Sequence, residues 1–139
     1  MKKTILKDNL ERQYDNLAIY AIGSTEPDLR ICMLLNQLLK INLTLSEDCE
    51  VVVKKEMVTF RKYTFESEET NEKISLYVNG NNGYKLFPEI SKIDYILVIQ
   101  TEGNIAGIEN SVLTLREKPD ITVLMKLNPR SLKSISRII

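Results

Sequence analysis

Residues 17–22 read LAIYAI, a continuous run of apolar side chains that ends at Gly23. An unbroken apolar run of this length is typical of a strand buried on both faces, whereas a strand with one face in water alternates apolar and polar residues. We therefore expect residues 17–22 to form a central strand of a sheet that is covered on both sides.

A helix is expected directly after this strand, because apolar residues between positions 29 and 39 recur three and four residues apart, on one helical face. The segments 51–53, 57–65 and 74–78 are rich in β-branched and aromatic residues and predict strands. The alternation in residues 57–65 shifts across Arg61 and Lys62, which predicts a bulge there.

The second half of the chain contains further strand, turn and helix patterns. The sequence NGNNG at residues 79–83 contains the residues that most easily adopt a positive φ, and it predicts a chain reversal. Further along, the patterns predict a strand at 93–99, a helix at 104–116 and a strand at 121–125.

This order of elements favours an α+β fold. We expect a mostly antiparallel sheet with two helices packed on one face, a ferredoxin-like variant, plus a short C-terminal helix. A chain of 139 residues is long enough for one domain with its own core. We expect residues 1–139 to form that domain, with residues 1–14 as a loosely ordered N-terminal arm and residues 129–139 as a C-terminal amphipathic helix.

The composition argues against several classes of site. The chain has no histidine, which is the commonest general base and a frequent metal ligand. Its two cysteines, Cys32 and Cys49, match no zinc or redox spacing. We therefore expect no catalytic residue, no metal site and no cofactor.

Charge and hydropathy give expectations about partners and location. The 19 basic residues are balanced by 19 acidic ones, whereas nucleic-acid-binding domains concentrate lysine and arginine. No apolar stretch approaches the ~20 residues that cross a bilayer, and the N-terminus carries no pattern of an export signal. We expect a cytoplasmic protein that binds neither nucleic acid nor a membrane.

The segment LFPEISKIDYIL at residues 86–97 resembles the signature of the IPExxxVDY family of small bacterial proteins. Its spacing is intact, and two apolar positions carry a different apolar residue. The matching residues are Pro88, Glu89, Asp94 and Tyr95, with Phe87 in place of isoleucine and Ile93 in place of valine. The resemblance implies a bacterial protein and no reaction, ligand or catalytic residue.

The motif itself has two physical interpretations. If residues 90–92 make one helical turn, Glu89 and Asp94 can meet and serve as an acid and a base or bind a hard metal ion. Alternatively, Glu89 caps amides around the corner, Asp94 pairs with a base such as Arg30, and Tyr95 packs on the first helix. We favour this structural interpretation, because buried polar groups usually have structural partners. The candidate binding residues are Arg30, Phe87, Pro88, Glu89, Asp94 and Tyr95.

The C-terminal segment has the strongest interaction pattern. A basic amphipathic helix of about ten residues is too short to persist alone, so its apolar side packs on its own domain, a second copy or another protein. That side consists of Leu132, Ile135, Ile138 and Ile139.

Three functions stay open on the sequence alone. We favour a non-catalytic binding or scaffold module that forms a homodimer or binds a protein partner through this segment. The alternatives are a small-metabolite-binding regulatory domain and a carboxylate- or metal-dependent enzyme that uses Glu89 and Asp94 together with Tyr95.

Overall fold

The computed structural model describes residues 16–138, so the expected arm at residues 1–14 lies outside the described residues. Here α marks α-helices, β strands and η 3₁₀ turns. In chain order the elements are β1 (Leu17–Gly23), α2 (Asp28–Leu39), β2 (Thr44–Leu45), β3 (Cys49–Val53), β4 (Glu56–Phe60), β5 (Lys62–Ser67), β6 (Glu72–Val78), β7 (Gly80–Asn81), β8 (Tyr84–Lys85), η1 (Pro88–Ile90), β9 (Tyr95–Thr101), α3 (Ile105–Leu113), η2 (Thr114–Glu117), β10 (Val123–Leu127), η3 (Pro129–Ser131) and η4 (Ile135–Arg137).

Six strands form one sheet in the order β10-β1-β9-β6-β5-β2, and every neighbouring pair is antiparallel. Two small antiparallel sheets, β3-β4 and β7-β8, complete the chain. The predicted α+β class with a mostly antiparallel sheet and two helices is confirmed. β1 is an interior strand, and all seven of its residues are buried, which follows from its apolar run.

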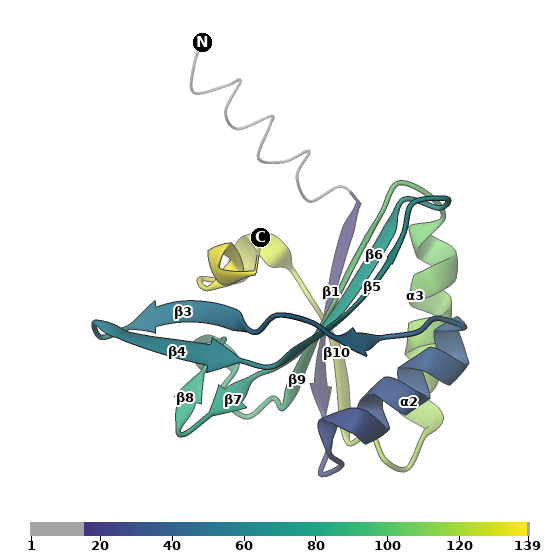
Figure 1. Cartoon of the computed structure of the whole chain (residues 1–139). Helices are drawn as coiled ribbons and strands as arrows, with labels where there is room; N and C mark the ends of the chain where they lie inside the picture. The colour runs from purple at the N-terminus through teal and green to yellow at the C-terminus, as the bar shows by residue number, and fades with distance from the viewer. Residues whose placement is uncertain (1–15, 139) are drawn as a thin grey trace.

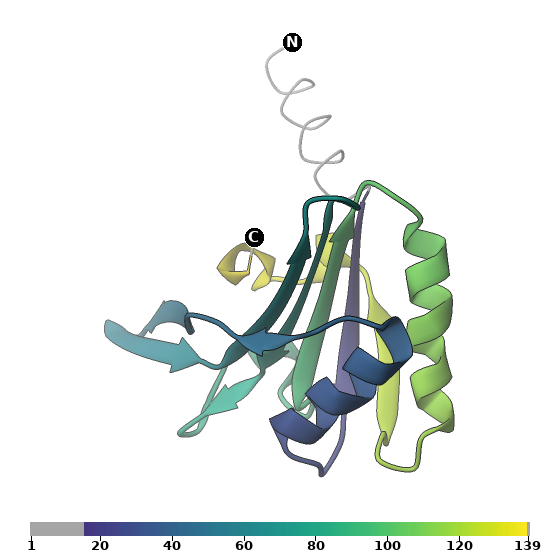
Figure 2. The same cartoon turned by 45° about the vertical axis from the view of Figure 1, so that its right-hand side comes forward.

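Alternate residues of the sheet belong to two apolar clusters, one on each face. On the first face, side chains of α2 and α3 pack against Tyr20, Leu97 and their neighbours. Both helices lie on this side of the sheet in two views (Figures 1 and 2). On the second face, Ile19 and Val98 contact side chains of the β3-β4 hairpin and the C-terminal segment. None of the helices in residues 16–138 is long and apolar enough to cross a membrane.

The single strand predicted at residues 57–65 is wrong. It is two strands, β4 and β5, separated at Arg61, and they pair with different partners. The side chain of Phe60 belongs to the second-face cluster, whereas that of Tyr63 belongs to the first-face cluster. Because β4 belongs to the small sheet that packs on the second face and β5 is a strand of the six-stranded sheet, the chain changes sheets at Arg61, which a bulge within one strand cannot provide.

The chain reversal predicted at residues 79–83 is confirmed, since β7 and β8 pair across Asn82 and Gly83. Both turn residues have positive φ, 49° and 84°, as a two-residue hairpin turn requires. The tight turn of the β3-β4 hairpin also uses positive φ, 49° at Lys54 and 69° at Lys55. Two lysines are unusual there, because a side chain with a Cβ is strained in the left-handed region.

The predicted C-terminal helix at residues 129–139 is also wrong. The segment forms two 3₁₀ turns, η3 and η4, separated by Leu132 in an extended conformation. The apolar residues Leu132, Ile135 and Ile138 recur every three residues, and the extended backbone at Leu132 interrupts any continuous helix through them. All three pack against the second-face cluster, and Ile139 lies outside the described residues.

Candidate functional site

The corner between β8 and β9, which carries the family-like motif, is organised by the fully buried Asn79. Its side-chain amide donates to the carbonyl oxygens of Ile90 (3.2 Å) and Ile93 (2.9 Å). Its side-chain oxygen accepts from the backbone amide of Phe87 (2.8 Å). One side chain thus fixes the corner at both ends.

Glu89 of the motif binds the C-terminal segment. Its two carboxylate oxygens accept from the backbone amide and the hydroxyl of Ser134, at 2.7 and 2.8 Å. Burial alone would raise the pKa of the Glu89 carboxyl. Hydrogen bonds from its own backbone amide and from Ser134 outweigh that effect and lower the pKa below its usual value. Glu89 is therefore an ionised anchor for the tail.

Asp94 and Tyr95 hold the loop between β1 and α2. The Asp94 carboxylate accepts from the backbone amide of Ser24 (2.9 Å), and the Tyr95 hydroxyl donates to the carbonyl oxygen of Glu26 (2.6 Å). Burial, together with nearby carboxylates, raises the pKa of Tyr95 to about 12. The phenol therefore stays protonated and able to donate at neutral pH.

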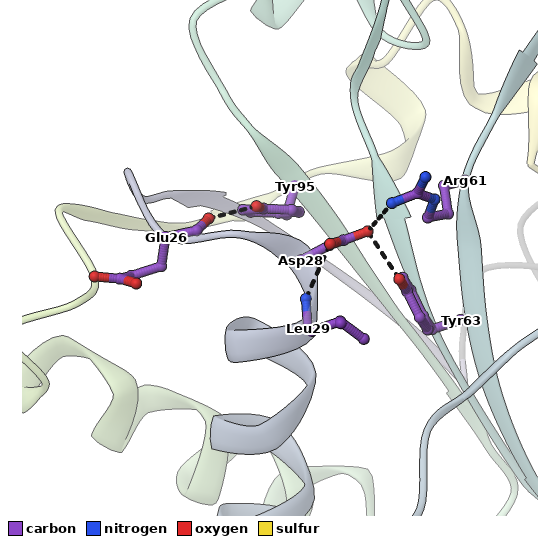
Figure 3. Close-up of polar contacts among 6 residues, drawn as sticks. All are labelled: Glu26, Asp28, Leu29, Arg61, Tyr63 and Tyr95. Atoms are coloured by element: carbon purple, nitrogen blue, oxygen red, sulfur yellow. Dashed lines mark hydrogen bonds and ion pairs between the residues drawn. The ribbon is translucent and has the colours of Figure 1, made fainter.

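The first residue of α2 continues this set of contacts (Figure 3). The Asp28 carboxylate accepts from the Arg61 guanidinium and from the Tyr63 hydroxyl, both at 2.8 Å. Burial alone would raise the pKa of Asp28, but the hydrogen bonds from Arg61 and Tyr63 outweigh it and lower that pKa. The start of α2 is thus tied to β5 on one side and, through Glu26 and Tyr95, to β9 on the other.

The remaining motif residues also have structural surroundings. Phe87 is fully buried, and Pro88 is the first residue of η1, where its missing N–H costs nothing. The expected pairing of Arg30 with Asp94 is wrong, because Arg30 forms its ion pair with Asp120 at 3.1 Å. Asp94 instead accepts a backbone amide, which needs no base nearby.

The arrangement does not bring the motif carboxylates to one shared group. Glu89 contacts the tail at Ser134, and Asp94 contacts the β1–α2 loop at Ser24. Within residues 16–138 no group of three or more potential ligand side chains is placed to hold a metal ion. Burial raises the pKa of the Cys32 thiol to about 12, and burial also raises that of Cys49, so both thiols are weak nucleophiles at neutral pH.

Sequence reasoning missed Asn79 and Ser134. The sequence places Asn79 in the predicted turn, because asparagine before glycine usually marks a turn. The available signal was its place directly after the apolar strand β6, where a buried amide can complete a corner. Ser134 carried no signal, since its partner Glu89 is 45 residues away in the chain.

Neither the models of protein families nor the curated proteins give a match to this chain.

Proposed function

We propose that this chain is a non-catalytic binding or scaffold module of the bacterial cytoplasm. One observation carries the proposal: the polar motif side chains, Glu89, Asp94 and Tyr95, all contact other segments of the same chain. A catalytic group needs an atom directed at a substrate, whereas these groups fix a loop and a tail. The motif then maintains a shape that other surfaces use.

An exposed apolar spot elsewhere on the domain supports a binding role. Val52 and Met57 of the β3-β4 hairpin are 64% and 60% exposed, and they lie side by side as cross-strand partners, so they form one continuous apolar spot. Leu132, Ile135 and Ile138 of the tail, by contrast, pack on their own domain. The hairpin is therefore our candidate for the contact with a partner.

We also propose a finer identity for the fold and the family. The strand order β10-β1-β9-β6, with α2 after β1 and α3 between β9 and β10, supports a ferredoxin-like core extended by β5 and β2. Distinct contacts for Glu89, Asp94 and Tyr95 support membership of the IPExxxVDY family, because each of these motif positions then has a structural reason.

A photo-crosslinking experiment tests the binding function. A photoreactive amino acid replaces Met57 in the full-length chain, and a control chain carries it at Leu113 of α3, which is also exposed. After irradiation in bacterial cells we expect crosslinked products at position 57, to another protein or to a second copy, and markedly fewer at position 113. Equal or absent crosslinking at the two positions would refute the proposal.

A metal titration tests the enzyme alternative. An ion that binds the native state must raise the melting temperature. Because we expect no carboxylate site, we expect Mg²⁺, Mn²⁺ and Ca²⁺ to leave the melting temperature unchanged. A rise that disappears in the Glu89→Gln and Asp94→Asn variants would instead establish a carboxylate site.

A further inference from the structure

We propose that the outer face of the β3-β4 hairpin is a self-complementary interface, on which the hairpin of a second copy packs antiparallel about a two-fold axis. This inference rests on the proposed binding function and names the partner and the surface. The hairpin extends away from both helices, toward the left in Figures 1 and 2. On its outer face Val52 and Met57 are exposed.

The two faces of the hairpin differ in chemistry. Val51, Val58 and Phe60 point inward and are buried in the second-face cluster. Val52 and Met57 are cross-strand partners on the other side, and both are exposed. Cross-strand apolar pairs stabilise contacts best when water is excluded from them. The outer face thus has an uncovered apolar centre.

Opposite charges lie at the two ends of this face. Lys54 and Lys55 form the exposed tip, while Glu47, Asp48 and Glu50 lie at the base. None of these five residues takes part in an ion pair among those that join residues 16–138. The three carboxylate residues, with Thr59, line an open hollow of about 580 Å³ at the base. A cationic side chain from outside the chain fits such a hollow.

The spacing of these charges suits a two-fold axis. Glu50 precedes Val52 by two residues on β3 and so lies about 7 Å from it along the strand, on the same side of the hairpin. Lys54 and Lys55 form the turn just beyond the other end of the apolar pair. A two-fold axis that lies in the plane of the interface and crosses the strands at the Val52–Met57 pair reverses the direction of the second hairpin. The lysine tip of each copy then lies opposite the acidic base of the other. The contact closes with two copies, because an isologous interface uses the same surface on both.

The turn itself supports a role for the lysines. This chain builds its other tight turn from Asn82 and Gly83, the pair that adopts positive φ most easily. At the tip of β3-β4, two lysines occupy the same conformation in spite of the steric strain. A strained residue pair that keeps two charges at an exposed tip is explained if those charges bind something.

The size of the face sets the expected strength. Five residues on each of two strands present less than the roughly 800 Å² per partner of a standard protein interface. We therefore expect a concentration-dependent dimer that exchanges with the monomer, held by the apolar centre and steered by the two charge contacts.

Sedimentation equilibrium of the full chain tests the interface through charge exchange. The wild type is expected to rise from the 16.0 kDa monomer toward twice that mass as its concentration increases. The tip variant Lys54→Glu/Lys55→Glu and the base variant Glu47→Lys/Glu50→Lys should each associate at least tenfold more weakly. An equimolar mixture of the two should associate again, because each tip then meets an oppositely charged base. The control Lys92→Glu/Lys118→Glu, which changes the net charge as the tip variant does, should behave as the wild type.

Either of two sedimentation results would overturn the inference. One is a wild type that remains monomeric up to about 1 mM protein. The other is association that the tip and base variants leave unchanged or that their mixture fails to restore. Circular dichroism confirms that each variant is folded, which is expected because all the substituted side chains are exposed. Crosslinking of Met57 to a different protein would keep the binding function and remove the second copy as its partner.

Discussion

Replacing Asn79 by alanine is the sharpest test of how the motif corner is held. The substitution removes both hydrogen bonds that the side-chain amide donates and the one that its oxygen accepts. Two of the three bonds, those with Phe87 and Ile93, are buried, so water cannot replace the lost partner. The backbone amide of Phe87 and the carbonyl oxygen of Ile93 are then left unsatisfied in the interior.

The expected loss of stability follows from these two groups. A buried donor or acceptor left without a partner costs about 1–3 kcal/mol, so Asn79→Ala is expected to lower the free energy of unfolding by about 2–6 kcal/mol. Native domains are stable by only about 5–15 kcal/mol, so this single amide accounts for a large fraction of the total.

Urea denaturation followed by circular dichroism measures the difference. The control is Asn110→Ala in α3, the same substitution at an exposed position, for which we expect a change within about 0.5 kcal/mol. If Asn79→Ala costs no more than this control, the reasoning about the corner is refuted.

The Asn79→Asp variant separates the amide donor from the acceptor. Its carboxylate can still accept from Phe87, but it faces the carbonyl oxygens of Ile90 and Ile93, so the pKa of the new carboxyl should rise above its unfolded value of about 3.9. Because the protonated form can donate a hydrogen bond, stability relative to the wild type should be greatest below pH 4 and fall as the pH rises. A relative stability that does not change with pH would contradict this account.

Three further predictions concern Glu89, Cys32 and Arg30. Since the pKa of Glu89 is lowered in the folded chain, its contact with Ser134 stabilises the tail above the unfolded pKa of about 4.3 and is lost as the pH falls through the folded value. Hydrogen-exchange protection of residues 133–138 should therefore decrease in acid, and a Glu89→Gln chain that retains the wild-type pH dependence would argue against this. Ellman's reagent at pH 8 should label Cys32 far more slowly in the native than in the urea-unfolded protein, and comparable rates would show that the raised pKa and burial do not protect it. Arg30→Ala should change the free energy of unfolding by less than about 1 kcal/mol, because its ion pair with Asp120 lies at the surface. A larger loss of stability in urea denaturation would contradict this prediction.

Periodicity and apolar runs predicted much of the fold, because they report directly on burial. The apolar run of β1 and the helical spacing of α2 are local patterns. In the structure the residues of β1 and one side of α2 are buried, as these patterns indicate. The change from one sheet to another at Arg61 was not predictable in the same way. It depends on which partner β4 and β5 each find, and that partner is distant in sequence.

In the candidate site, too, the local pattern was predictable and the contacts between distant segments were not. The sequence indicated that Glu89, Asp94 and Tyr95 matter as a group, and the structural interpretation of the motif needed only their types and spacing. Their actual partners, Ser134, Ser24 and Glu26, are 45, 70 and 69 residues away, and hydrogen bonds over such separations leave no local pattern. The expected pairing of Arg30 with Asp94 failed for this reason.

The position of β1 between β9 and β10 has a consequence for synthesis of the chain. β1 ends at Gly23, whereas its first partner begins at Tyr95, 72 residues later. A ribosome needs roughly 4–15 s to add that length at 5–20 residues per second. Throughout that interval the nascent polypeptide displays an unpaired LAIYAI segment, a ready target for holdase chaperones that shield apolar stretches before translation ends.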